Sequence, residues 1–233
     1  YGYVMTEIKR AEDLTQDKMP TFYAVTKILK VEVMHRVSDY YGPIVYSQFG
    51  KSPTGVMPDS QKDAYYAFFN DLEEAIDILQ QYQGEDTFAR FDYLMPANYR
   101  TYNQWIRFAN SLRLRLAIRI AMADPPKAKH EALKSLDPAN INLLETRDDL
   151  VAVSTSGSGY TNPLGEINQA WKEASMNANM ESILVGYDDP RTTKYFRPAT
   201  GNGYKGEYRG IRQGTGFNHM EYYNHSRPTI DQY

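Results

Sequence analysis

The sequence WIRFANSLRLRLAIR, from Trp105 to Arg119, decides the fold class. Its apolar residues recur at every third or fourth position, which is the period of one face of an α-helix. We therefore predict a helix from about Thr101 to Ala123. Four arginines share it, and their stems can lie along apolar neighbours while the guanidinium groups reach carboxylates or carbonyls. These arginines are Arg107, Arg113, Arg115 and Arg119.

Two earlier segments carry the same helical period. Residues 21–37 place Phe22, Val25 and Leu29 on one stripe, and the helix is expected to end before Gly42-Pro43. The second helix begins after Ser60, which with Asp63 forms a variant of the capping box, and Gly84 closes it. Shorter helices are predicted for residues 126–136 and 179–185, and a helical turn for residues 88–94.

The spacing of the three long helices indicates a repeat-like scaffold. Their predicted starts at Thr21, Ser60 and Thr101 lie 39 and 41 residues apart, longer than the tetratricopeptide period of about 34 residues. We predict a mainly α fold, an irregular helical scaffold with tetratricopeptide-like helix pairs plus long loops. Residues 1–137 form the scaffold, and residues 138–233 form a loop-rich part of the same domain.

Composition excludes several kinds of partner and site. The net charge is −3, with 26 basic and 29 acidic residues, so no nucleic acid partner is expected. The absence of cysteine removes disulfides, thiolate nucleophiles and zinc ribbons. No apolar run reaches the roughly 20 residues that span a bilayer.

Tyrosine is over-represented, with 20 residues against 9 Phe and 2 Trp. Its flat apolar ring and polar tip suit surfaces that hold a ligand through both packing and hydrogen bonds. Tyr65, Tyr66, Tyr82 and Tyr102 lie in or beside helices and are interpreted as packing residues. Aromatic and amide side chains in the loop-rich part are the ligand-binding candidates, because such groups suit the CH-rich faces and hydroxyl rim of a sugar. These candidates are Tyr160, Asn162, Trp171, Tyr204, Tyr208, Tyr222 and Tyr223.

Motifs for catalysis or cofactor binding have structural explanations. Residues 201–206 match G-x-G-x-x-G but lack the flanking strand and helix that give this pattern its mechanism, so we interpret them as a turn. The four histidines, His35, His130, His219 and His225, show no metal-ligand spacing. The adjacent carboxylates at 73–74, 148–149 and 188–189 do not supply the opposed pair that a glycosidase needs. We therefore expect no catalytic residues, no metal and no cofactor.

Three stretches together resemble the SusD/RagB family of outer-membrane nutrient-binding lipoproteins. They are KILKVEVMHRVSDYYGPIVYS at residues 27–47, the arginine-rich helix at 105–119, and Asp189-Pro190-Arg191 followed by Tyr195-Phe196. Residues 208–214, YRGIRQG, resemble the glycine turn that follows in the family. The resemblance spans most of the chain in the family's order, and the arginine-rich helix is its most specific part.

The resemblance implies a lipid-anchored protein on the outer membrane that lids a SusC-like TonB-dependent transporter. It also implies that the protein delivers an oligosaccharide or other nutrient, which in some members is a peptide, without being an enzyme. The anchor cysteine is absent and the chain ends at Tyr233, so we expect a fragment of a longer protein. The resemblance assigns no ligand contact to a numbered position.

Three functions compete at this point. The first is glycan binding for a transporter, indicated by the loop aromatics and the resemblance. The second is a helical-repeat scaffold that docks a partner protein, or a SusD-like protein that binds peptides. The third is a glycosidase, which needs two carboxylates facing one cleft.

Overall fold

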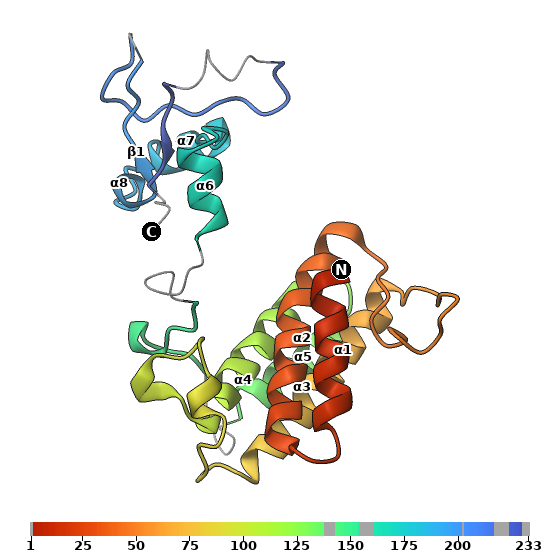
Figure 1. Cartoon of the computed structure of the whole chain (residues 1–233). Coiled ribbons are helices and arrows are strands. Elements are labelled where there is room, and N and C mark those ends of the chain that lie inside the picture. The colour runs from red at the N-terminus through yellow and green to blue at the C-terminus, as the bar shows by residue number, and fades with distance from the viewer. Residues whose placement is uncertain (1, 138–142, 154–160, 202, 217–223, 230–233) are drawn as a thin grey trace. The chain divides into compact units, whose positions relative to one another are not determined.

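The computed structural model describes residues 2–137, 143–153, 161–201, 203–216 and 224–229 (Figure 1). Helices make up most of the regular structure in this part of the chain, which confirms the mainly α fold class. The elements are α1 Gly2–Thr15, α2 Pro20–Tyr41, α3 Gln61–Gln80, η1 Ala89–Phe91, η2 Ala97–Tyr99, α4 Tyr102–Arg119, α5 Pro125–Ser135, η4 Arg147–Asp149, α6 Pro163–Gln169, α7 Ala178–Leu184, α8 Thr192–Tyr195, β1 Phe196–Arg197 and β2 Arg227–Pro228.

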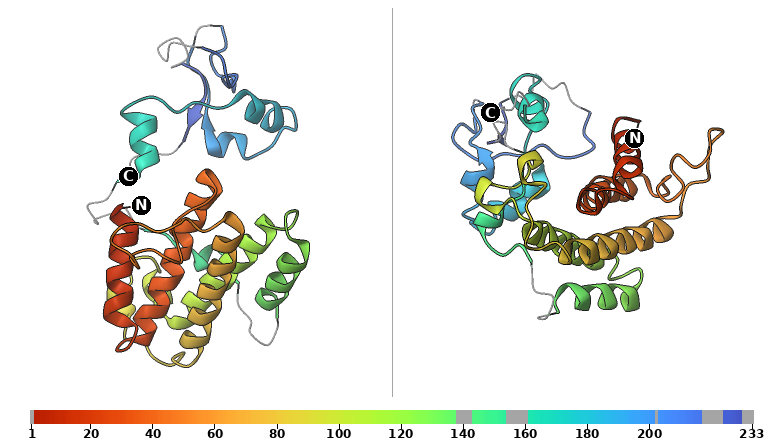
Figure 2. Two further views of the ribbon diagram at one scale, coloured as in Figure 1. Left: turned by 90° about the vertical axis from the view of Figure 1, so that its right-hand side faces the viewer. Right: turned by 60° about the horizontal axis from the view of Figure 1, so that its bottom comes forward.

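The chain divides into two compact units, Tyr1–Val153 and Ser154–Tyr233. In unit 1, helices α1 to α5 pack in chain order, each against the next, and a long connection at residues 42–60 joins α2 to α3 (Figure 2). This arrangement of sequence neighbours is typical of tetratricopeptide-like helix pairs.

Local sequence signals start and stop these helices. The Ser60 hydroxyl accepts the backbone N–H of Asp63 at 3.1 Å and donates to its carboxylate at 2.7 Å, which confirms Ser60 as the N-cap of α3. Pro20 and Pro125 occupy the first turns of α2 and α5, where a missing N–H costs nothing. Gly42 ends α2 with a positive φ of 79° and donates its N–H to Ser38 O at 2.8 Å.

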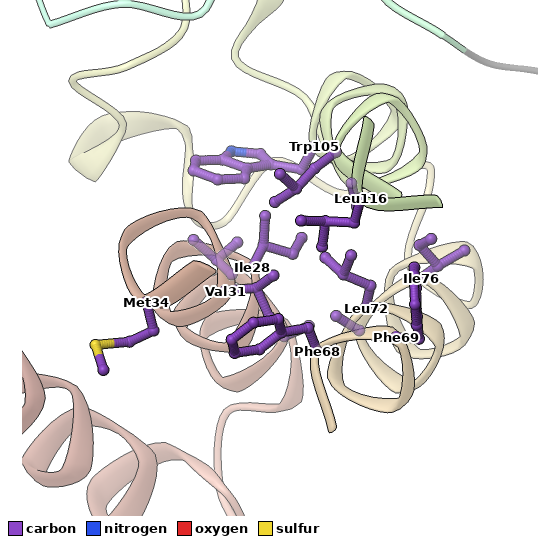
Figure 3. Packing of buried hydrophobic residues seen from close by; sticks show 14 of the residues in the cluster. Ile28, Val31, Met34, Phe68, Phe69, Leu72, Ile76, Trp105 and Leu116 are labelled. Atoms are coloured by element: carbon purple, nitrogen blue, oxygen red, sulfur yellow. The ribbon is translucent and has the colours of Figure 1, made fainter. Parts of the chain in front are cut away.

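The core of unit 1 lies where α2, α3 and α4 meet. Figure 3 shows Ile28 and Val31 of α2 together with Leu72 and Leu116 around a common interior. Trp105 closes it from α4, with 1% of its surface exposed, and its indole N–H donates to Asp92 at 2.8 Å. Burial on this scale is the main stabilising contribution to such a unit.

Three of the four arginines of α4 lie beside carboxylates, as predicted. Arg107 binds Asp149 at 2.9 Å and Arg119 binds Asp39 at 2.9 Å, while Arg113 lies 3.6 Å from Glu131. Each pair ties α4 to a different segment of unit 1.

The segment 143–153 therefore belongs with the helices. Its Leu144 N–H donates to the Ser111 hydroxyl at 2.8 Å, and its Ala152 N–H donates to Leu94 O at 3.1 Å. The division between the two compact units falls after Val153, whereas the sequence pattern placed the end of the scaffold at 137. Loop composition alone does not reveal that this segment lies along α4.

The predicted helices are present, with small shifts at their ends. The spans predicted from Thr21, Ser60, Thr101, Pro126 and Asn179 correspond to α2, α3, α4, α5 and α7. The sequence pattern gave no helix at α1, α6 or α8, where short length or sparse apolar spacing leaves little period to detect. Among the described helices, none combines the length and apolar character needed to cross a membrane.

Candidate functional site

Unit 2 is built from short elements joined by a frame of backbone hydrogen bonds. Met176 N–H donates to Ser226 O at 2.7 Å, Ile211 N–H donates to Met176 O at 2.7 Å, and Ser226 N–H donates to Arg209 O at 2.9 Å. The Ser226 side chain is fully buried and its hydroxyl accepts from Arg209 N–H at 2.8 Å. Three segments distant in sequence are thereby fixed to one another, and they support the loops between them.

Gly210 is required where two of these segments cross. A Cβ at this position would lie 2.6 Å from the carbonyl carbon and oxygen of Asn177. Glu181 of α7 accepts the Gly210 N–H at 2.8 Å and pairs with Arg209 at 3.3 Å. The close backbone approach explains the glycine in the sequence YRGIRQG.

Tyr204 lies in the turn at residues 201–206 and packs within it. Its ring is so close to Gly201 that a Cβ there would lie 2.6 Å away. The ring also lies against His225, with centroids 5.0 Å apart. Gly203 and Gly206 have positive φ values, which fits the turn that the sequence predicted. Tyr204 is half-buried, because part of its ring packs against the turn itself.

Trp171 is presented on a tight turn after α6. Its backbone N–H donates to Glu166 O at 3.2 Å, and Glu173 N–H donates to Ile167 O at 3.1 Å. Between them Lys172 takes a left-handed φ of 61°, which is uncommon for a residue with a side chain. The turn leaves Trp171 57% exposed, although most of the indole surface is apolar.

The other ligand-binding candidates from the sequence are less exposed than Trp171, serve a structural role, or lie outside the described residues. Asn162 caps α6, because its side-chain oxygen accepts the Leu164 N–H at 3.0 Å. Tyr208 is half-buried beside the glycine turn. Three of the predicted residues lie outside the described part of the chain, namely Tyr160, Tyr222 and Tyr223.

Two exposed tyrosines of unit 2 were missed by the sequence analysis. Tyr187 is 83% exposed and Tyr195 is 50% exposed. Between them the Asp189 carboxylate accepts from the Arg191 guanidinium at 2.9 and 3.1 Å. This pairing lowers the pKa of Asp189 to about 2 and fixes the turn. Gly186 and Pro190, which flank this turn in the sequence, are the local signal for an exposed loop at Tyr187.

The family model of the Susd and RagB outer membrane lipoproteins matches residues 1–233. The chain belongs to this SusD-like family. The expected resemblance is thus confirmed over the whole sequence.

Solved structures of SusD homologues resemble this SusD-like chain closely. A homologue from Bacteroides vulgatus is 40% identical with a TM-score of 0.85, and the match covers 96% of this chain and 45% of the homologue. A chitin-binding SusD homologue from Flavobacterium johnsoniae is 36% identical with a TM-score of 0.87, and the match covers 98% of this chain and 47% of the homologue. A homologue from Bacteroides uniformis is 33% identical with a TM-score of 0.83, and the match covers 98% of this chain and 47% of the homologue.

The SusD-like chain spans about half the length of these structures. No curated protein sequence matches it. The family and fold therefore come from the family model and the solved structures, and the comparisons do not assign a ligand contact to any residue of this chain.

At least one member of each carboxylate pair makes a structural contact. Glu73 and Glu74 pair with Lys134 and Lys27. Asp149 accepts the N–H groups of Glu145 and Thr146 at 3.0 Å each. Within the described residues, no group of three histidine or carboxylate side chains is placed to hold a metal ion.

Proposed function

We propose that this SusD-like chain is part of a cell-surface protein that binds a glycan and passes it to a SusC-like TonB-dependent transporter, without catalysing a reaction. Membership of a family of outer membrane lipoproteins supports the location. The 36% identical Flavobacterium johnsoniae homologue is described as chitin-binding, which supports a glycan as the ligand.

The observation that carries the proposal is the exposed indole of Trp171 on its pinned turn. An indole presents a wide flat face, and burying it against the CH groups of a sugar removes apolar surface from water. Because the turn is fixed by hydrogen bonds on both sides, little conformational freedom is lost when a ligand binds. Exposed Tyr187 and half-buried Tyr208 and Tyr204 are further candidate contacts in the same unit.

Calorimetric titration with a panel of glycans tests the proposal, with chitin oligosaccharides as the first probe. Trp171→Ala should weaken binding about 30-fold, the effect of losing roughly 2 kcal/mol at a central aromatic contact. Leu164→Ala is the matched control, because Leu164 is 57% exposed on the neighbouring α6 and is not aromatic. Equal affinities for the two variants, or binding of peptides and no glycan, would contradict the proposal.

A second candidate function, docking of a partner protein, is favoured by the α4–α5 hairpin. Four large apolar side chains are more than half exposed there, which is typical of surfaces that meet another protein. They are Ile118 at 67%, Met122 at 95%, Leu133 at 59% and Leu136 at 53%. If these residues dock the transporter, Met122→Lys with Leu133→Lys should abolish its co-purification with the intact parent protein and leave glycan affinity unchanged.

A further inference from the structure

A second concave site lies in unit 1, where the end of α2, the first turn of α3 and the α4–α5 junction meet. The cavity has a volume of about 380 Å³, within the usual range of small-molecule sites. We call it the α3–α4 pocket. It is lined by Asp39, Gln61, Lys62, Tyr65, Tyr66, Arg119, Ile120, Ala123 and Asp124.

One side of the α3–α4 pocket is a fixed polar group centred on Asp39. The Tyr65 hydroxyl donates to one carboxylate oxygen at 2.5 Å, and the Arg119 guanidinium lies 2.9 Å from the other. Burial, together with the bond to Asp39, raises the pKa of Tyr65 to about 12, so its phenol stays protonated. Each carboxylate oxygen has two acceptor sites, so Asp39 can still accept from a ligand hydroxyl.

The opposite side is centred on Asp124 and the ring of Tyr66. The Tyr66 hydroxyl donates to Asp124 at 2.6 Å, while the other carboxylate oxygen caps α5 through Lys127 N–H at 3.2 Å. The ammonium groups of Lys62 and Lys127 lie 5.5 and 5.0 Å from the centroid of the Tyr66 ring. Tyr66 is thus a half-buried aromatic face whose orientation is held by a hydrogen bond.

Charge and polarity restrict the kind of ligand that fits. Asp39 and Asp124 balance Lys62 and Arg119, so the lining carries no net charge and favours neither an anion nor a cation. Ile120 and Ala123 add an apolar wall. A neutral ring that has CH faces and a rim of hydroxyl groups matches both the donors and acceptors and the apolar surface.

We propose that the α3–α4 pocket of unit 1 binds one neutral sugar ring, as a site separate from the glycan contact proposed at Trp171. The inference rests on the proposed function for the class of ligand, but it concerns residues that the sequence analysis interpreted as packing. The sequence does not indicate that the consecutive residues Tyr65 and Tyr66 lie on opposite sides of one pocket.

Methyl and indole NMR of the whole chain tests the pocket directly, with glucose, N-acetylglucosamine and chitotriose as probes. We expect saturable shifts of the Ile120 and Ala123 methyl groups. Ile78, which packs on the core away from the pocket, is the internal control. The Trp171 indole N–H reports the proposed glycan surface independently, and the Trp105 indole N–H reports whether the fold is intact.

Two variants connect the shifts to the pocket. Ala123→Phe fills the space without removing a polar group and should weaken the Ile120 response at least tenfold. Met122→Phe is the matched control, because Met122 is 95% exposed and does not line the pocket. Lys62→Gln, also at an exposed position, should weaken the response several-fold.

The outcomes separate the two proposals. Shifts at Trp171 with none at Ile120 would overturn the pocket inference and leave the proposed function standing. Shifts at Ile120 that Ala123→Phe removes would support the pocket, whatever Trp171 shows. If no sugar shifts either the Ile120 methyl signals or the Trp171 indole signal, both proposals are overturned. If dialanine shifts the Ile120 signals and no sugar does, the pocket binds peptides and the sugar proposal is wrong.

Discussion

The Nζ atom of Lys27, on α2, lies 2.7 Å from Oδ1 of Asp71, on α3, in a position where the two side chains are 7% and 15% exposed. Lys30 extends this buried network, because it lies 3.1 Å from Glu12 of α1 and 3.5 Å from Asp71. Tyr46 completes it by donating its hydroxyl to Asp71 at 2.5 Å. Charged groups thus join three helices in a region that would otherwise be apolar.

Replacing Lys27 by Met should lower the free energy of unfolding by about 3 kcal/mol, because Asp71 would lose its closest cation while remaining buried. Chemical denaturation of both proteins measures the difference. Lys9→Met is the control, since Lys9 pairs with Asp13 on the surface and should cost less than about 1 kcal/mol. Equal losses for the two variants would show that the buried network does not stabilise unit 1.

The same pair predicts a loss of stability at alkaline pH. Burial alone would lower the pKa of Lys27, but Asp71 and Glu74 outweigh it and raise the pKa above the ordinary 10.5. The pair therefore contributes fully below pH 10.5, and its contribution is lost as the pH rises through the folded-state pKa. Thermal unfolding from pH 9 to 12 should show a steeper loss for the native chain than for Lys27→Met.

Asp149 predicts a local response to acid in the segment that lies along α4. Backbone N–H groups of Glu145 and Thr146 hold the pKa of Asp149 well below the ordinary 3.8, with a further contribution from Arg107. Stabilisation by this group is present above pH 3.8 and is lost as the pH falls through the folded-state pKa.

Asp149→Asn should mimic this loss at neutral pH, with faster amide hydrogen exchange in residues 144–152. Asp148→Asn is the matched control, because the Asp148 side chain is exposed. Unchanged exchange in the Asp149 variant would mean that other contacts hold the segment.

Gly210→Ala should destabilise unit 2 by about 1–3 kcal/mol, the usual cost of adding a methyl group to a space already filled. The clash is with backbone atoms of Asn177, which cannot move aside as a side-chain tip can. Hydrogen exchange of residues 176–178 and 226 measures the effect. Gly216→Ala is the control, since a Cβ there meets nothing within 4 Å. Exchange at residues 176–178 and 226 should be faster in Gly210→Ala and unchanged in Gly216→Ala, and equal rates in the two variants would contradict the prediction.

The two tryptophans should be separable by fluorescence. Trp171 is 57% exposed and Trp105 is 1% exposed, so iodide should quench only the emission of Trp171. Trp171→Phe should leave a blue-shifted emission that iodide scarcely affects. Strong quenching in that variant would show that Trp105 is accessible and that the core of unit 1 is looser than described.

Sequence alone determined the three long helices of the scaffold, because their signals are local. Ser60 caps α3 by accepting the Asp63 N–H, and the apolar period of residues 105–119 identifies one helix without reference to any neighbour. The same reasoning predicted that the arginines of α4 would reach carboxylates or carbonyls. Each of these depends on a spacing of a few residues or on a face of a single helix.

Only the tertiary structure decided what those side chains and the loop aromatics do. The sequence does not show that Lys27 and Lys30 face inward, since that depends on Asp71 and Glu12 arriving from other helices. Tyr204 and Trp171 have equally polar neighbours in sequence, yet one ring packs on Gly201 and His225 while the other stands exposed. The burial of a side chain depends on which segments distant in sequence pack around it, and a local sequence pattern carries no information about that packing.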